Sequence, residues 1–176
     1  MNRAVFLDRD GTINKEVEYL SRVEDFEFLP NTLKALEKLS RTNYKIIVVT
    51  NQSGIARGLF TEKKIDEIHK HMLRQLGRKG IRIDKIYVCP HHPDDNCTCR
   101  KPRIGLLKKA AEEFNINLRE SYLVGDTTQD VQTGLNAGCK TILVKTGYAG
   151  KDGRYPTKPD QVAEDLLDAV DNVILK

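Results

Sequence analysis

Two carboxylates stand two residues apart, directly after the first apolar run of the chain. Ala4–Leu7 is small or apolar throughout, and it leads into Asp8-Arg9-Asp10-Gly11-Thr12. Like charges this close repel each other, and burial makes the repulsion worse. A divalent cation relieves it by stabilising the ionised forms, and a carboxylate can also be a nucleophile that forms an aspartyl-phosphate. The pair therefore predicts a metal ion at this position, a reaction at Asp8, or both.

Three further polar clusters follow predicted strands, and their key residues are Thr50, Lys101 and Asp126. Because ligands bind beyond the carboxyl ends of parallel strands, we expect these clusters to converge on one edge of the sheet. Two or three carboxylates among Asp8, Asp10 and Asp126, with backbone oxygens, suit Mg²⁺, which binds through one or two carboxylates and a substrate phosphate. Mg²⁺, Lys101 and the Thr50 hydroxyl can then offset charge on a phosphoryl group. Asp130 begins a predicted helix, where acidic residues are common as helix caps.

A Cys/His segment at residues 89–99 forms a second candidate metal site. Cys89, His91, Cys97 and Cys99 follow the pattern C-x-H-x5-C-x-C, which supplies the ligands of a closed, structural Zn²⁺ site. Reduced cysteines without a metal are the alternative. The isolated Cys139 is expected to be a small core residue.

The elements that must position these residues alternate between strands and helices. Predicted strands cover Ala4–Leu7, Lys45–Thr50, Lys85–Cys89, Tyr122–Val124, Thr141–Val144 and Val173–Leu175. Predicted helices cover Asn31–Arg41, Thr61–Lys79, Ile104–Phe114, Asp130–Ala137 and Gln161–Val170. This alternation indicates an α/β three-layer sandwich with a mostly parallel, Rossmann-like sheet, formed by residues 1–176 as a single domain. The Gly- and Pro-rich segment Gly147–Pro159 is expected to be a surface loop.

Composition narrows the class of protein. The chain of 176 residues is 39% hydrophobic and 31% charged, with a formal net charge of +4, which is ordinary for a globular protein. It has no apolar run of the roughly 20 residues that a membrane span needs and no apolar leader before a cleavage site, so the expected location is the cytoplasm and no membrane partner is expected. The basic segment 62–85 lacks interleaved aromatic residues, so it is interpreted as a solvated helix face and not as a nucleic-acid site.

The four clusters together resemble the haloacid dehalogenase superfamily of phosphatases along essentially the whole chain. Its motifs are matched by Asp8-Arg9-Asp10-Gly11-Thr12, by Thr50 in VVTNQSG, by Lys101 in CRKP and by GDTTQD at residues 125–130. The resemblance implies that Asp8 attacks phosphorus and that Asp10 protonates the leaving oxygen and later activates water. It also implies that Mg²⁺ is held by the Asp8 carboxylate, the Asp10 main-chain carbonyl and Asp126. Under the same resemblance, Asp130 orients Lys101 or a metal-bound water.

Within the superfamily, DRDGTIN, the zinc loop and the short chain look like the heptose bisphosphate phosphatases, which share this loop with histidinol-phosphate phosphatases. The resemblance implies a monomer without a large cap domain that removes the C7 phosphate of a heptose 1,7-bisphosphate, for nucleotide-activated heptose of surface polysaccharide. Its expected partner is a small phosphorylated sugar. Arg100 would bind the C1 phosphate, because a guanidinium matches phosphate oxygens. The other expected substrate contacts are Glu16, Val17, Glu18, Tyr19, Asn51, Gln52 and Ser53.

Two alternatives remain at this point. In a histidinol-phosphate phosphatase, Glu16 and Glu18 would face the substrate's cation, although Arg100 argues against it. The second alternative is a non-catalytic zinc-loop binding module. Such a module would not need the complete set of motif residues, which are Asp8, Asp10, Thr50, Lys101 and Asp126. One departure concerns Thr127, where some heptose phosphatases carry a lysine, and it bears on the preferred anomer or substrate.

Overall fold

Six parallel strands form one sheet, in the order β3-β2-β1-β4-β5-β6. The computed structural model describes residues 1–176. The strands are β1 (Ala4–Leu7), β2 (Lys45–Asn51), β3 (Lys85–Cys89), β4 (Tyr122–Gly125), β5 (Lys140–Val144) and β6 (Gln161–Ala163). The α-helices are α1 (Thr32–Ser40), α2 (Glu62–Gly77), α3 (Gly105–Phe114), α4 (Thr128–Ala137) and α5 (Leu166–Ala169). Short 3₁₀ turns lie at η1 (Val23–Asp25) and η2 (Leu118–Glu120), and a π-helical turn, η3 (Val170–Ile174), follows α5.

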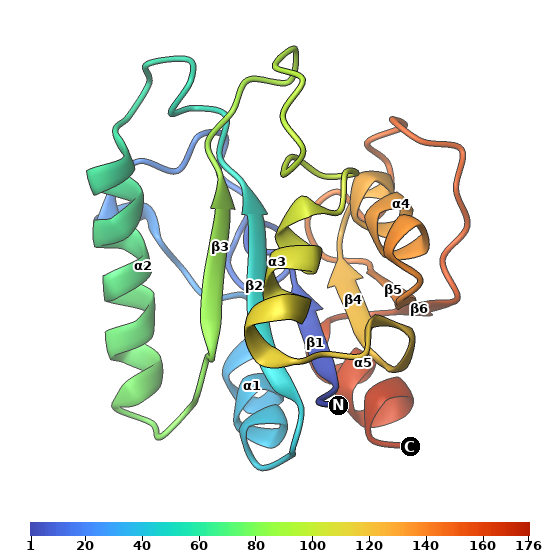
Figure 1. The fold of residues 1–176 in the computed structure, drawn as a ribbon. Helices are drawn as coiled ribbons and strands as arrows, with labels where there is room; N and C mark the ends of the chain where they lie inside the picture. The colour runs from blue at the N-terminus through green and yellow to red at the C-terminus, as the bar shows by residue number, and fades with distance from the viewer.

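The helices form a layer on each face of the sheet, and the direction of the chain decides which face each one covers. From β1 the chain moves to β2 and β3, then returns past β1 to β4, β5 and β6. Since crossovers between parallel strands are right-handed, reversing the direction places α3 and α4 on the face opposite α1 and α2. Figure 1 shows α3 and α4 in front of the sheet, with α1 behind it. The sheet therefore has its switch point between β1 and β4, where a crevice is expected.

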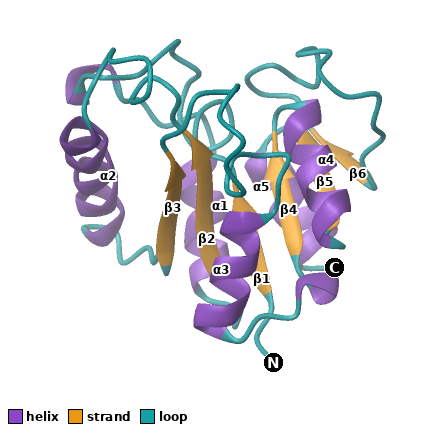
Figure 2. Ribbon diagram, turned by 45° about the horizontal axis from the view of Figure 1, so that its top comes forward, coloured by secondary structure: helices purple, strands orange, loops and turns teal.

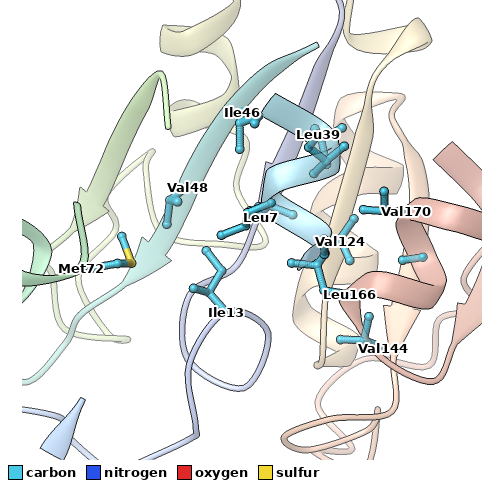
Figure 3. Packing of buried hydrophobic residues seen from close by; sticks show 14 of the residues in the cluster. Leu7, Ile13, Leu39, Ile46, Val48, Met72, Val124, Val144, Leu166 and Val170 are labelled. Atoms are coloured by element: carbon cyan, nitrogen blue, oxygen red, sulfur yellow. The ribbon is translucent and has the colours of Figure 1, made fainter. Parts of the chain in front are cut away.

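Alternate residues of each strand supply the two halves of the core. One half contains Val5 and Leu7 of β1 and packs against α1, α2 and α5 (Figure 3). The other half contains Ala4 and Phe6 and packs against α3. Because both faces are covered, the central strands are continuous apolar runs, as in β2, where Ile46–Thr50 is buried. Cys139 lies in the second half and is 5% exposed, which confirms that it is a core residue.

The C-terminal segment differs from the prediction. Gln161–Ala163 is strand β6, paired in parallel with β5, and not the start of a helix. The helix begins after Asp165, whose side chain accepts a hydrogen bond from the Asp168 backbone N–H. The predicted strand Val173–Leu175 is wrong as well, because the segment continues into the turn η3. The physical reason is spacing: positions 166, 169, 170 and 174 are buried, which is a helical period that extends past residue 170.

The predicted convergence of the polar clusters is confirmed. The loops that follow the strands gather above their carboxyl ends (Figure 2). The end of β1 lies beside β2 and β4, since Leu7 pairs with Val48 on one side and with Val124 on the other. Asp8, the next residue, thus lies at the switch point of the sheet, beside the ends of both neighbouring strands. None of the helices is long and apolar enough to cross a membrane.

Candidate active site

Lys101 bridges two carboxylates, that of Asp8 after β1 and that of Asp130 in the first turn of α4. Its Nζ donates to Asp8 Oδ1 at 2.8 Å and to Asp130 Oδ1 at 2.6 Å. The Lys101 and Asp130 side chains are only 3% and 1% exposed, whereas Asp8 borders a cleft. Burial opposes the charge of Lys101, but the two carboxylates outweigh this effect and raise the pKa of its ammonium group. Lys101 therefore stays protonated beside Asp8.

Asp126 is fully buried next to this ion pair, and it lacks one hydrogen-bond partner. Its Oδ2 accepts from the Tyr148 backbone N–H at 2.7 Å, while its Oδ1 has none. Gly11 and Gly147 both have positive φ, and a Cβ on either would lie within 2.3 Å of Asp126 Oδ2. The two glycines therefore permit the close approach of the backbone to this carboxylate.

The acidic cluster fits a divalent cation between Asp8 and Asp126. Carboxylate oxygens of Asp8, Asp126 and Asp130 lie within 4.8 Å of one another. Burial and nearby carboxylates raise the pKa of Asp126 to about 8, and burial also raises the pKa of Asp8 to about 7 despite Lys101. A cation would stabilise both carboxylates and give the unpartnered Asp126 oxygen a ligand role. Asp130 is already committed, since Lys101 binds one oxygen and Thr127 the other.

Asp130 both caps helix α4 and binds Lys101. Its Oδ2 accepts from the Thr127 backbone N–H at 3.2 Å, and the Thr127 hydroxyl accepts from the Asp130 N–H at 3.2 Å, which forms a capping box at the start of α4. The same carboxylate orients Lys101. Thr127, the departure noted above, thus has a structural function as the N-cap residue.

The Asp10 carboxylate is surrounded by hydrogen-bond donors. Arg9 reaches both of its oxygens, at 2.9 and 2.8 Å, and Asn14 and Gln52 each donate at 2.9 Å. Burial raises the pKa of Asp10, but Arg9 and these hydrogen bonds together lower it below its usual value. Arg9 is itself completely buried, and its Nη1 lies 3.0 Å from His69 Nε2 on α2. Neither Arg9 nor His69 was predicted from the sequence to support Asp10. The position of Arg9 between two site acids was the signal that could have indicated it.

Amide side chains at the end of β2 and in α4 connect the parts of the site. Gln52 Nε2 donates to the Thr50 hydroxyl at 2.8 Å as well as to Asp10. Asn51 Oδ1 accepts from the Lys101 backbone N–H at 3.1 Å, and Gln129 donates to the Lys101 carbonyl at 2.6 Å. These contacts fix the backbone that carries Lys101.

The Cys/His segment folds into a cluster suited to a tetrahedral metal. Cys89 Sγ lies 3.8 Å from Cys97 Sγ and 3.2 Å from Cys99 Sγ. His91 Nδ1 lies 3.5 Å from Cys89 Sγ and 3.2 Å from Cys99 Sγ. Ligands about 2.0 to 2.3 Å from a tetrahedral Zn²⁺ stand at similar separations. His92 instead pairs with Asp94 at 3.2 Å, so the structure brings together the four residues expected from the sequence.

A polar cleft opens above these residues. Only 4 of its 19 lining residues are hydrophobic, which favours a polar ligand over an apolar one. The lining includes all eight predicted substrate contacts, which are Glu16, Val17, Glu18, Tyr19, Asn51, Gln52, Ser53 and Arg100. It also includes Tyr148, Asp152 and Arg154, which the sequence analysis placed in a surface loop. Because this loop follows β5, the rule that ligands bind beyond the carboxyl ends of parallel strands applies to it as well. That position was the signal that could have identified these three residues.

The comparisons with known proteins agree with this geometry. A HAD-hydrolase-like family model matches residues 98–169. A D-glycero-beta-D-manno-heptose-1,7-bisphosphate 7-phosphatase from Yersinia pestis is 42% identical, over 82% of this chain and 81% of that protein. The corresponding protein of Haemophilus ducreyi is 41% identical over 96% of both chains. This chain belongs to the heptose-1,7-bisphosphate 7-phosphatase family.

Members of the heptose-1,7-bisphosphate 7-phosphatase family also share this fold. The crystal structure of the D,D-heptose 1,7-bisphosphate phosphatase of B. bronchiseptica, complexed with magnesium and phosphate, matches with a TM-score of 0.91. It is 35% identical and covers 98% of both chains. Relatives are named for either anomer, since the Campylobacter jejuni protein, 42% identical over 81% of both chains, is named for the alpha form. The resemblance seen in the motifs, including the absence of a large cap domain, is thereby confirmed.

Proposed function

We propose that this protein is a Mg²⁺-dependent phosphatase that removes the C7 phosphate of D-glycero-D-manno-heptose 1,7-bisphosphate. The observation that carries the proposal is the position of Asp8. Its carboxylate borders the cleft, accepts a hydrogen bond from the Lys101 ammonium, and lies near Asp126, which has an unpartnered carboxylate oxygen. The product, heptose 1-phosphate, would serve the synthesis of nucleotide-activated heptose. We place this activity in a cytoplasmic monomer.

In the first half-reaction, an Asp8 carboxylate oxygen forms a bond to phosphorus while the bond to the sugar C7 oxygen breaks, which gives an aspartyl-phosphate. Asp10 donates the proton that the leaving oxygen needs. In the second half-reaction Asp10 accepts a proton from water, which attacks the phosphorus and releases Asp8. The donors around Asp10 favour its carboxylate form, which is the form required in this second step.

Lys101 and Thr50 assist both steps from fixed positions. The Lys101 ammonium offsets negative charge on the phosphoryl oxygens, and Asp130 keeps it oriented. The Thr50 hydroxyl, held by Gln52, is positioned to donate to the same group. Mg²⁺, when bound by the Asp8 and Asp126 carboxylates and the Asp10 main-chain carbonyl, would supply further positive charge at the reacting phosphate.

We expect Mg²⁺ to stabilise the protein more strongly at pH 8 than at pH 5.5. The pKa values of about 7 for Asp8 and about 8 for Asp126 lie above the ordinary value, so folding takes up protons between about pH 4 and pH 8. The stability that these groups contribute without metal is fully present below about pH 4 and is lost as the pH rises through 7 to 8. Mg²⁺ needs the ionised carboxylates, and protons compete with it less at high pH.

Thermal unfolding with and without saturating Mg²⁺ measures this effect. The increase in Tm should be larger at pH 8 than at pH 5.5 by at least about 2 °C, since about 1 kcal/mol corresponds to 2–4 °C in a protein of this size. Asp126→Asn should abolish the pH dependence of the increase. An equal increase at both pH values in the unsubstituted protein would contradict the assignment of the Mg²⁺ ligands.

We further propose that Cys89, His91, Cys97 and Cys99 hold a structural Zn²⁺. Four protein ligands leave no open coordination position, which is the pattern of structural sites. Arg100 and Lys101 directly follow the last ligand, so the ion would fix the backbone on which both cationic side chains stand.

Replacing Cys97 with Ser should lower zinc content from one ion per chain to less than about 0.2, on the expectation that affinity falls more than 100-fold. Activity should fall about 10- to 100-fold, because Arg100 and Lys101 lose their fixed backbone. Metal analysis and phosphate release check both results. Cys139→Ala is the matched control, since it removes a thiol from the core and should keep zinc; full zinc content in Cys97→Ser would refute the site.

The substrate itself is tested by phosphate release from the two anomers of heptose 1,7-bisphosphate and from histidinol phosphate. We expect kcat/KM to favour one heptose anomer over histidinol phosphate, because Arg100 suits a second phosphate and would repel an amine. In the cleft, burial and the charges of Asp10 and Asp8 raise the pKa of Glu16 to about 7, so Glu16 is suited to meet sugar hydroxyls. A preference for histidinol phosphate would overturn the proposed substrate and leave the phosphatase chemistry intact.

A further inference from the structure

The loop after β5 is fastened to the centre of the active site. The Thr146 hydroxyl donates to the Gly11 carbonyl at 2.6 Å. The Tyr148 backbone N–H donates to Asp126 Oδ2, and the Gly150 N–H donates to the Asp126 carbonyl, both at 2.7 Å. The position of this loop is therefore linked to Asp126, the proposed Mg²⁺ ligand.

The part of the loop that carries Arg154 is fixed on both sides of that residue. Before it, the Asp152 carboxylate accepts from the backbone N–H and from the hydroxyl of Thr128, both at 2.7 Å. After it, the Tyr155 backbone N–H donates to the same hydroxyl at 3.1 Å. Since Thr128 is the first residue of α4, the backbone at Arg154 is held against the start of a helix and its side chain borders the cleft.

Arg154 and Arg100 both border the cleft, and neither has a carboxylate within salt-bridge distance. The Nη1 atom of Arg100 is buried and has no hydrogen-bond partner. Two of the acids that border the cleft, Asp10 and Asp152, are already bound by other groups of the protein. Two guanidinium groups thus border the cleft without a carboxylate partner, and a bound anion would satisfy the free donor of Arg100.

We propose that Arg154 is a specificity-determining residue that binds, together with Arg100, a second phosphate of the substrate, distant from the phosphate that Asp8 attacks. This inference rests on the proposed function, and it extends the recognition of the substrate to the loop after β5. The loop is then a wall of the substrate site, and Arg154 distinguishes bisphosphates from monophosphates.

The test compares heptose 1,7-bisphosphate with heptose 7-phosphate, which lacks the second phosphate, as substrates of the unsubstituted protein and of Arg154→Gln. We expect kcat/KM for the bisphosphate to fall about 10- to 100-fold in the variant, as for a lost hydrogen-bonded ion pair. The change should lie mainly in KM, and kcat/KM for the monophosphate should stay within about twofold. Arg154→Lys should recover part of the loss, because it keeps the charge without the paired donors. Arg119→Gln, an exposed arginine in η2 before β4, is the control for a loss of charge alone.

The outcomes separate this inference from the proposed function. A preference for the bisphosphate that persists undiminished in Arg154→Gln would overturn the inference and leave the proposed function intact. An equal loss for both substrates would also overturn it, since Arg154 would then act through the position of Asp126. Failure of the unsubstituted protein to hydrolyse either heptose would overturn both.

Discussion

Replacing Asp8 with Asn is expected to reduce kcat at least about 10⁴-fold, with the fold unchanged, because loss of a nucleophile removes the covalent route. The amide oxygen of Asn can still accept the hydrogen bond that Lys101 now donates to Asp8 Oδ1. The substitution also removes one of the carboxylates that repel each other in the buried cluster. Catalysis and folding should therefore separate at this position. Phosphate release measures the first effect, and thermal unfolding measures the second.

A covalent intermediate gives the sharper readout. Mass spectrometry of the protein quenched during turnover should find one phosphoryl group on Asp8 and none in Asp8→Asn. Asp66→Asn, an exposed acid on α2, is the matched control and should keep both turnover and the intermediate. Turnover by Asp8→Asn within tenfold of the unsubstituted protein would exclude Asp8 as the nucleophile.

Replacing Lys101 with Met should impair both activity and stability. Activity should fall about 10²- to 10³-fold, because the site loses a fixed positive charge at the phosphoryl group. Stability should fall by about 3 to 5 kcal/mol, because the substitution leaves Asp8 and Asp130 buried without their partner. Steady-state kinetics and urea unfolding, both with Mg²⁺ present, measure the two losses.

The double variant Lys101→Met/Asp130→Asn distinguishes the two functions of Lys101. Removal of the unpaired Asp130 charge should recover most of the lost stability, since the neutral side chain can still accept hydrogen bonds from Thr127. Activity should stay low, because the charge beside Asp8 is still missing. Recovery of activity together with stability would show that Lys101 acts only by holding the fold.

Much of the site could be predicted because strand ends and motifs are local in sequence. The apolar runs that become β1, β2 and β4 each stop at a polar residue, and parallel pairing brings these ends together whatever lies between them. His91, and not His92, lies with the three thiols of the Cys/His segment, as the pattern C-x-H-x5-C-x-C predicts.

The misread regions depended on contacts between distant segments. Gln161–Ala163 is a strand only because β5 lies beside it to accept its pairing, and three residues carry too little pattern to show this. Burial of Arg9 between Asp10 and His69 required α2 to pack against the first loop. A charged residue with no such partner would be expected at the surface.

The sequence by itself determined the polar residues at the strand ends, the Cys/His pattern of residues 89–99 and the acidic pair at the end of the first strand. Each of these is encoded in residue types and spacings within about a dozen positions, where periodicity and ligand geometry act directly. Only the tertiary structure decided that Asp130 both caps α4 and orients Lys101, and that the loop after β5 carries Arg154 to the cleft. The physical reason is that hydrogen bonds such as that from Tyr148 to Asp126 join segments 22 residues apart, and their geometry exists only after the sheet has assembled.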